Sequence, residues 1–87
     1  MPEFEFDPAK SAANLAKHGI DFDAAQAIWR DTHRIEVSAR TTDEPRWMVI
    51  GQAGGQHWSA VITYRDEHVR IISVRRSREG EVAIYEG

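Results

Sequence analysis

The sequence predicts an α+β fold in which two N-terminal helices pack on a four-stranded antiparallel sheet and a short helix ends the chain. Three observations lead to this prediction. Apolar residues recur at helical spacing in the first third, residues from 34 onward alternate or run together as in strands, and short turn sequences separate the strand segments. Because the 87 residues contain no linker, repeat or low-complexity stretch, we expect residues 1–87 to form a single domain.

The first helix is predicted from its two ends. The segment from Phe4 to Phe6 alternates like a short strand, and Asp7-Pro8 then supplies a helix cap followed by proline at the first helical position. The helix should run to about His18, because Gly19 readily adopts the left-handed conformation that ends many helices. Three apolar residues share one face of it: Ala12, Leu15 and Ala16.

A second, shorter helix is predicted from about Phe22 to Trp29. Asp21 precedes it as a cap, and its apolar residues recur at helical spacing. These residues are Phe22, Ala25, Ile28 and Trp29. The first third of the chain is therefore predicted to be a helical hairpin.

Four strands and a last helix are predicted after Asp31, where the apolar pattern changes to a period of two. A polar connection from Ala39 to Pro45 separates the first two strands, Gly54-Gly55 marks a hairpin turn, and Asp66-Glu67-His68 a second turn. The predicted elements are strands Arg34–Ser38, Arg46–Gly51, His57–Tyr64 and Val69–Arg76, and a helix from about Arg78 to Tyr85.

The large aromatic residues fall at helix and strand positions that should face inward. We therefore interpret them as core residues in preference to surfaces for stacking on nucleic-acid bases. They are Phe4, Phe6, Phe22, Trp29, Trp47 and Trp58.

Charge is unevenly distributed along the chain. The net charge is −3, yet residues 65–78 hold the five arginines Arg65, Arg70, Arg75, Arg76 and Arg78 against two acidic residues. Guanidinium groups match phosphate geometry, so a strand that ends in clustered arginines suggests contact with a polyanion. On an acidic body, such a patch suits a small site acting on a few phosphates better than a long nucleic-acid track.

Composition excludes several classes of protein. The chain has no cysteine, so disulfides, thiol catalysis and cysteine-based zinc sites are excluded. No apolar run approaches the roughly 20 residues that span a bilayer, and the acidic N-terminus is unlike a signal peptide. We expect a cytoplasmic protein that needs no cofactor and has no membrane association.

Several motifs in collinear order resemble the BrnT family of toxins from bacterial type II toxin-antitoxin modules. The motifs are Phe4-x-Phe6-Asp7-x-x-Lys10-x-x-x-Asn14-x-x-Lys17-His18-Gly19-Ile20-x-Phe22, Arg46-x-x-x-Ile50-Gly51, Thr63-x-Arg65, Arg70-Ile71-Ile72-Ser73-x-Arg75-Arg76 and Glu81-x-x-x-Tyr85-Glu86. The resemblance implies a RelE-like ribonuclease fold, an endoribonuclease that blocks translation, and neutralisation by a DNA-binding antitoxin called BrnA. It also implies a homodimer or a toxin-antitoxin heterotetramer, between which the sequence does not choose.

One departure from the family pattern concerns the last helix. Members of this family often place more arginines around its glutamate, whereas the neighbouring positions here are Glu79, Gly80, Val82 and Ala83. This departure weakens the expected binding of RNA, so that the protein is either a less active member or relies more heavily on Arg75, Arg76 and Arg78.

Metal-free RNA cleavage needs groups that move protons and a cation that stabilises the phosphate in the transition state. His18 beside Lys17 at a helix end is an acid/base candidate, although both residues can equally complement the helix dipole. Arg65 lies near the hairpin tip, roughly 20 Å from Arg75, so the two cannot hold one phosphate. We favour Arg75 with Arg76 for the chemistry, and Arg65 for flanking RNA.

The last helix adds two candidates, because Glu81 and Tyr85 are one turn apart and can project together. The glutamate can act as a base or orient an arginine, and the tyrosine can stack on a base; both can instead dock the helix. The predicted catalytic residues are His18, Arg65, Arg75, Arg76 and Glu81, and the predicted RNA-binding residues are Lys17, Arg70, Arg78 and Tyr85.

Two classes of function compete at this point. One is a metal-independent endoribonuclease, and the other is a noncatalytic module whose arginine strand docks an acidic protein or RNA partner. A metal-dependent nuclease is disfavoured, because the acidic residues are scattered along the chain and form no carboxylate cluster in the sequence.

Overall fold

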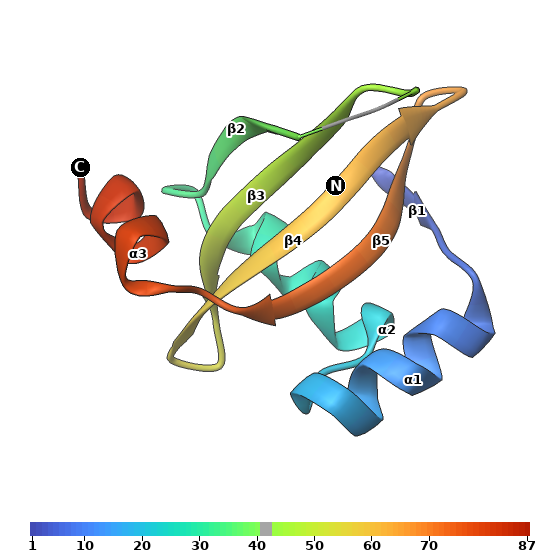
Figure 1. Ribbon diagram of the computed structural model, residues 1–87, viewed down its shortest axis with the longest axis horizontal. Coiled ribbons are helices and arrows are strands. Elements are labelled where there is room, and N and C mark those ends of the chain that lie inside the picture. The colour runs from blue at the N-terminus through green and yellow to red at the C-terminus, as the bar shows by residue number, and fades with distance from the viewer. Residues whose placement is uncertain (41–42) are drawn as a thin grey trace.

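A computed structural model describes residues 1–40 and 43–87, and within them the chain is a mixed α+β structure. A five-stranded sheet carries helices on both faces (Figure 1). In chain order the elements are β1 (Glu3–Glu5), α1 (Pro8–His18), α2 (Phe22–Ala25), the 3-10 helix η1 (Gln26–Arg30), β2 (Ile35–Ala39), β3 (Arg46–Ala53), β4 (Gln56–Arg65), β5 (His68–Arg76) and α3 (Glu79–Glu86). The predicted polar connection from Ala39 to Pro45 includes residues 41–42, which lie outside the described residues.

The strand order β1-β5-β4-β3-β2 corrects the predicted sheet. Strands β2 to β5 form the expected antiparallel meander, but β1 adds a fifth strand that pairs parallel to β5, with Phe4 opposite Val69. The prediction of four antiparallel strands is therefore wrong at this edge. The prediction paired only strands that follow one another along the chain, whereas β1 and β5 come from opposite ends of the chain.

Helix α1 has the predicted ends, but its apolar face is exposed and its buried residues are polar. Asp7 caps it by accepting a hydrogen bond from the Ala9 amide, and Gly19 ends it at φ 79°. The face that shares Ala12, Leu15 and Ala16 is exposed. The buried residues of the helix are the polar Ser11 and Asn14, so buried hydrogen bonds join this helix to its neighbours.

Asn14 completes the edge of β5 beyond the short β1. Its amide nitrogen donates to the carbonyl oxygens of Val74 and Ile20, and its oxygen accepts from the Val74 amide, at distances of 2.8–3.2 Å. The side chain thus makes the two bonds that a neighbouring strand would make with Val74.

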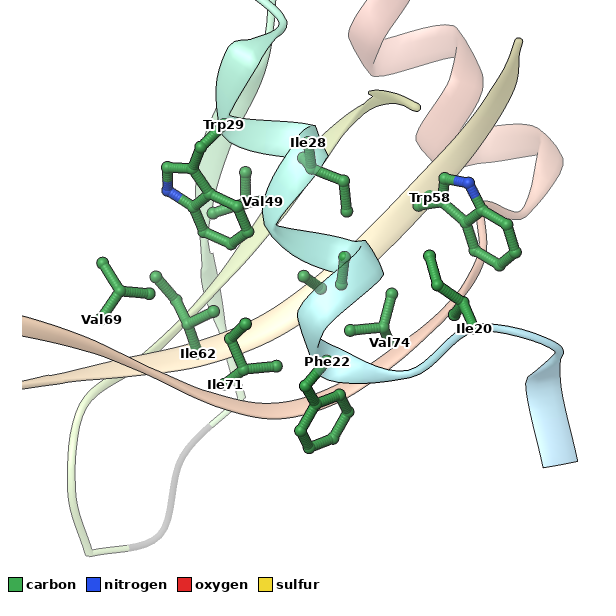
Figure 2. Close-up of a cluster of buried hydrophobic side chains, with 12 residues drawn as sticks. Ile20, Phe22, Ile28, Trp29, Val49, Trp58, Ile62, Val69, Ile71 and Val74 are labelled. Carbon is green, nitrogen blue, oxygen red and sulfur yellow. The ribbon is translucent and has the colours of Figure 1, made fainter. Parts of the chain in front are cut away.

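The core lies between the sheet and the α2–η1 segment (Figure 2). Asp21 caps α2 as predicted, but the helix tightens into a 3-10 segment after Ala25. The aromatic residues predicted as core belong to this cluster or pack against it. The largest fully buried side chains of this cluster are Phe22, Ile28, Val49, Ile62, Ile71 and Val74.

A β-bulge in β5 decides which residues face the core. Val61 pairs with Ser73 and Ile62 pairs with Ile71, so Ile72 is an extra residue without a partner in β4. Before the bulge, Val69 and Ile71 point into the core, and strict alternation would send Arg75 there as well. The extra residue reverses the alternation, so that Val74 is buried in the core and Arg75 faces the opposite side.

Two-residue turns connect the last three strands. Gly54 and Gly55 form the predicted turn, with φ of 61° and 78°. The second turn contains Asp66 and Glu67, also at positive φ (48° and 68°), whereas His68 already belongs to β5. Positive φ at both turn residues is the type I′ pattern, which normally uses Asn and Gly.

Helix α3 packs on the sheet face opposite α1 and α2, at the end where β4 begins and β5 finishes (Figure 1). It begins one residue later than predicted, with Arg78 as its cap. None of its residues is buried, but Ile50, paired with Ser59 on this face of the sheet, is fully buried.

Candidate active site

The candidate active site forms where β4 and β5 present side chains beneath α3. Ser59 of β4 lies opposite Arg75 of β5, and the bulge at Ile72 brings Arg75 to the face on which Ser59 lies and which α3 covers. Strand β5 ends at Arg76, and after Ser77 and Arg78 helix α3 begins and returns Glu81 to this pair. The short connection therefore places an acid next to an arginine on a rigid strand.

Glu81 is the centre of the site's hydrogen bonds. Arg75 donates to both of its oxygens, with Nη1 to Oε1 at 2.8 Å and Nη2 to Oε2 at 2.7 Å. Ser59 Oγ donates to Oε1 at 2.8 Å, and the Arg78 amide donates to the same oxygen at 2.9 Å. Ser77 Oγ lies 2.8 Å from Ser59 Oγ. The carboxylate thus fixes the guanidinium of Arg75 in one orientation.

These bonds keep Glu81 ionised. The hydrogen bond from Arg75, with those from the Arg78 amide and Ser59, lowers the pKa of Glu81 to about 2 against the opposing effect of burial. The same bond raises the pKa of Arg75. A carboxylate with so low a pKa is a weak base, so Glu81 is suited to orienting Arg75 rather than to removing a proton.

A second cluster lies beside the first on the same face. The ring of His57 packs edge-on against Tyr85, with centroids 5.1 Å apart, and its Nε2 lies 3.3 Å from the side-chain nitrogen of Gln52. Tyr85 donates to Asp31 Oδ2 at 2.6 Å, and this bond raises the pKa of Tyr85 to about 12.

Asp31 connects this cluster to the other side of the sheet. Burial opposes its ionisation, but hydrogen bonds from Tyr85, the Gln52 amide and the His33 amide together lower the pKa of Asp31. The close approach of η1 and Asp31 to strand β3 requires a glycine at position 51, since a Cβ there would lie 2.9 Å from Ile28 Cγ2.

Of the predicted catalytic residues, the structure brings Arg75 and Glu81 into contact. Arg76, the next residue, lies on the other face, where its guanidinium is 5.7 Å from the centroid of the Trp58 ring. His18 is the last residue of α1, in the helical layer on that same other face. Arg65 lies at the far end of β4, paired with Glu44 at 3.5 Å and six residues from Ser59.

The predicted RNA-binding residues are also separated. Tyr85 adjoins the site through His57, and Arg78 caps α3 with its backbone amide on Glu81. Arg70 pairs with Glu5 of β1 at 2.8 Å, and Lys17 is exposed in the last turn of α1.

Sequence reasoning missed His57, Ser59 and Ser77. Ser59 and His57 were predicted to lie in one strand. Because they are two positions apart, their side chains are expected on the same face of the sheet. What pairs Ser59 with Arg75 is the bulge, for which the sequence carries no local signal. Among the residues that the structure describes, His, Asp and Glu side chains form no group of three that could hold a metal ion.

The fold and site define a small α+β protein with an arginine held on one sheet face by a glutamate from its last helix. A family model described as "Ribonuclease toxin, BrnT, of type II toxin-antitoxin system" matches residues 6–81. The chain belongs to this BrnT family, which implies an RNA substrate and an antitoxin partner. A search of curated proteins gave no match. No helix in the described ranges is long and apolar enough to cross a membrane.

Proposed function

We propose that this protein is an endoribonuclease that cleaves RNA without a metal ion, with Arg75 stabilising the scissile phosphate. The observation that carries the proposal is the bidentate contact of Glu81 with Arg75, whose side chain is 28% exposed. A guanidinium held in one orientation and still accessible can bind the charge that develops on phosphate at little cost in reorganisation.

The other predicted residues take supporting roles in this proposal. Arg78 and Tyr85 flank the Arg75–Glu81 pair, which supports assigning them to contacts with neighbouring nucleotides. Arg76, on the opposite face, is assigned to RNA that passes the end of β5, and Arg65 to RNA farther along β4. At the end of α1, Lys17 remains a predicted RNA contact and His18 a predicted acid/base residue.

The biological setting follows from the family. We propose that cleavage in the cytoplasm inhibits translation and growth, and that a BrnA-type antitoxin neutralises the protein. The antiparallel meander with an N-terminal helical layer supports the RelE-like relationship that the motifs imply. Co-purification with the protein encoded beside it, and recovery of growth when both are expressed, would test the antitoxin.

Substitution of Arg75 tests the catalytic proposal. Arg75→Lys keeps a positive charge but loses the planar fork, so we expect cleavage of a defined RNA, in the presence of EDTA, to fall at least about 100-fold. Arg30→Lys, at an exposed position ending η1, is the matched control. Both variants should show a cooperative thermal transition.

Three outcomes separate the alternatives. Wild-type cleavage lost in EDTA would contradict metal independence. Cleavage by Arg75→Lys at the wild-type rate would remove Arg75 from the site. RNA binding by the wild type without cleavage would favour the noncatalytic module.

A further inference from the structure

His57 and Arg75 are diagonal neighbours on one face of the sheet. His57 and Ser59 are two residues apart in β4 and point to the same face, and Ser59 lies opposite Arg75. The Ser77 amide donates to the His57 carbonyl at 3.0 Å, so the pairing continues past β5 and places Arg75 diagonally across from His57. Diagonal positions in an antiparallel pair are about 7–8 Å apart at the backbone, a spacing that long side chains span. A phosphodiester bound by Arg75 on this face would therefore lie on the same side of the sheet as the imidazole.

The surroundings of His57 leave one ring nitrogen available. Gln52 from β3 lies against Nε2, and Tyr85 from α3 covers one side of the ring. Nδ1 has no hydrogen-bond partner among the residues that the structure describes. The charged or titratable groups facing this region are Tyr85 and Glu81 from α3, Arg75 from β5 and Asp31, which binds Tyr85.

The neighbouring groups are poor proton donors near neutral pH. The arginine does not release a proton, the hydrogen bond to Asp31 raises the pKa of Tyr85 to about 12, and Glu81 is already ionised. Imidazole is the side chain that exchanges a proton most readily in this range. His57 is therefore the group in this cluster best suited to donating a proton to a leaving oxygen.

We propose that His57 is a catalytic residue of this ribonuclease, protonating the 5′-oxygen that leaves when the RNA strand is cut. This inference rests on the proposed function. The 2′-hydroxyl attacks the phosphorus and gives its proton to water, the O2′–P bond forms, and the P–O5′ bond breaks. The imidazolium of His57 gives its proton to the 5′-oxygen and is reprotonated from water. The products are a 2′,3′-cyclic phosphate and a 5′-hydroxyl.

A modified substrate tests this role directly. In an RNA whose scissile 5′-oxygen is replaced by sulfur, the leaving thiolate needs no proton. We expect His57→Gln to cleave ordinary RNA about 100- to 10,000-fold more slowly than the wild type, and to cleave the sulfur-substituted RNA within tenfold of the wild-type rate. The decline of the wild-type rate toward high pH, which a proton donor imposes because it must carry its proton, should change in the variant.

A second substitution and a control complete the experiment. His57→Phe keeps a ring against Tyr85 and should give the same pattern, and His68→Gln, where β5 begins at the far end of the sheet, should leave both rates nearly unchanged. An equal loss on both substrates, in variants that unfold cooperatively, would overturn the proton-donor role, as would wild-type rates in both variants. Failure of the proposed function looks different, because the wild type would then cleave neither RNA.

Discussion

Glu81 shows how one side chain organises the site. It accepts hydrogen bonds from Arg75, Ser59 and the Arg78 amide while remaining partly accessible, with its side chain 13% exposed. Each donor stabilises the ionised form of the carboxylate. Because Arg75 and Ser59 belong to the sheet and Glu81 to α3, these hydrogen bonds also hold the helix against the sheet. Its protonation state therefore affects both the orientation of Arg75 and the docking of the last helix.

We predict that Glu81 makes folding stability depend on pH in the acidic range. The pKa of Glu81 is about 2 in the folded protein against an ordinary value of 4.5, so its contribution is present above about pH 4.5 and is lost as the pH falls toward 2. Glu81→Gln should be less stable than the wild type at pH 7 and should lose less stability over this range. Urea unfolding at a series of pH values measures this difference.

Glu79→Gln is the control, because Glu79 is an exposed acid in the first turn of the same helix. It should retain the wild-type slope. An identical slope for Glu81→Gln and the wild type would contradict the assignment.

Asn14 is the second residue on which much depends. Asn14→Ala leaves the amide and carbonyl of Val74 and the carbonyl of Ile20 without this partner. We expect the free energy of unfolding to fall by about 2–4 kcal/mol, because each buried group left unpaired costs about 1–3 kcal/mol. Leu15→Ala on the same helix, where Leu15 is 49% exposed, should change it by less than about 0.5 kcal/mol. Similar losses in the two variants, measured by chemical unfolding, would contradict this account.

At the level of elements, the turn between β4 and β5 carries avoidable strain. Asp66 and Glu67 both have positive φ, which costs residues with a side chain roughly 1–2 kcal/mol and costs glycine little. We predict that replacing the pair by Asn-Gly stabilises the protein by about 1 kcal/mol and raises its melting temperature. Glu67→Ala removes the charge without relieving the strain and should give no comparable gain. Equal stabilisation by Ala and Gly would point to charge instead of conformation.

The elements predicted correctly are those with local signals. Asp7, Asp21 and Gly19 mark helix ends through their own chemistry, and Gly54-Gly55 marks a turn in the same way. The parallel pairing of β1 with β5 depends on residues more than 60 positions apart, and no short motif encodes it.

The site was predicted less completely for a related reason. Arg75 and Glu81 were identified as candidates from charge and from the resemblance, but their contact requires the bulge and the return of α3. Arg76 adjoins Arg75 in sequence and lies on the other face of the sheet, a separation that follows once both residues belong to one strand. His57 carried no charge pattern that distinguished it from the other histidines.

For the whole molecule, Asp31 joins the two helical layers around the edge of the sheet. It follows η1 on the core side, bonds the Gln52 amide of β3 and accepts from Tyr85 of α3. Since no residue of α3 is buried, this contact and the Glu81 contacts are its main polar attachments in the described part of the chain.

We predict that Tyr85→Phe loosens α3 without unfolding the sheet. Removal of one hydrogen bond worth about 1 kcal/mol should raise amide hydrogen exchange in α3 several-fold, while exchange in β4 remains at the wild-type rate. Tyr64→Phe is a control for loss of a tyrosine hydroxyl, since Tyr64 is an exposed residue of β4 distant from α3. A uniform change in amide exchange across all elements would contradict the attachment of α3 through the Tyr85 hydrogen bond.

The unpaired Ile72 has a consequence for how this chain tolerates changes in length. Deleting Ile72 would remove the bulge and leave Val74 in the core and Arg75 opposite Ser59, because simple alternation from Ile71 then gives the same pairs. Inserting one residue between Ile71 and Arg75, with the bulge kept, would instead turn the Arg75 guanidinium toward Phe22 and its apolar neighbours and should abolish both folding and activity. When such sequences are aligned, a single gap placed here therefore leaves inside and outside unchanged for everything that follows in the strand.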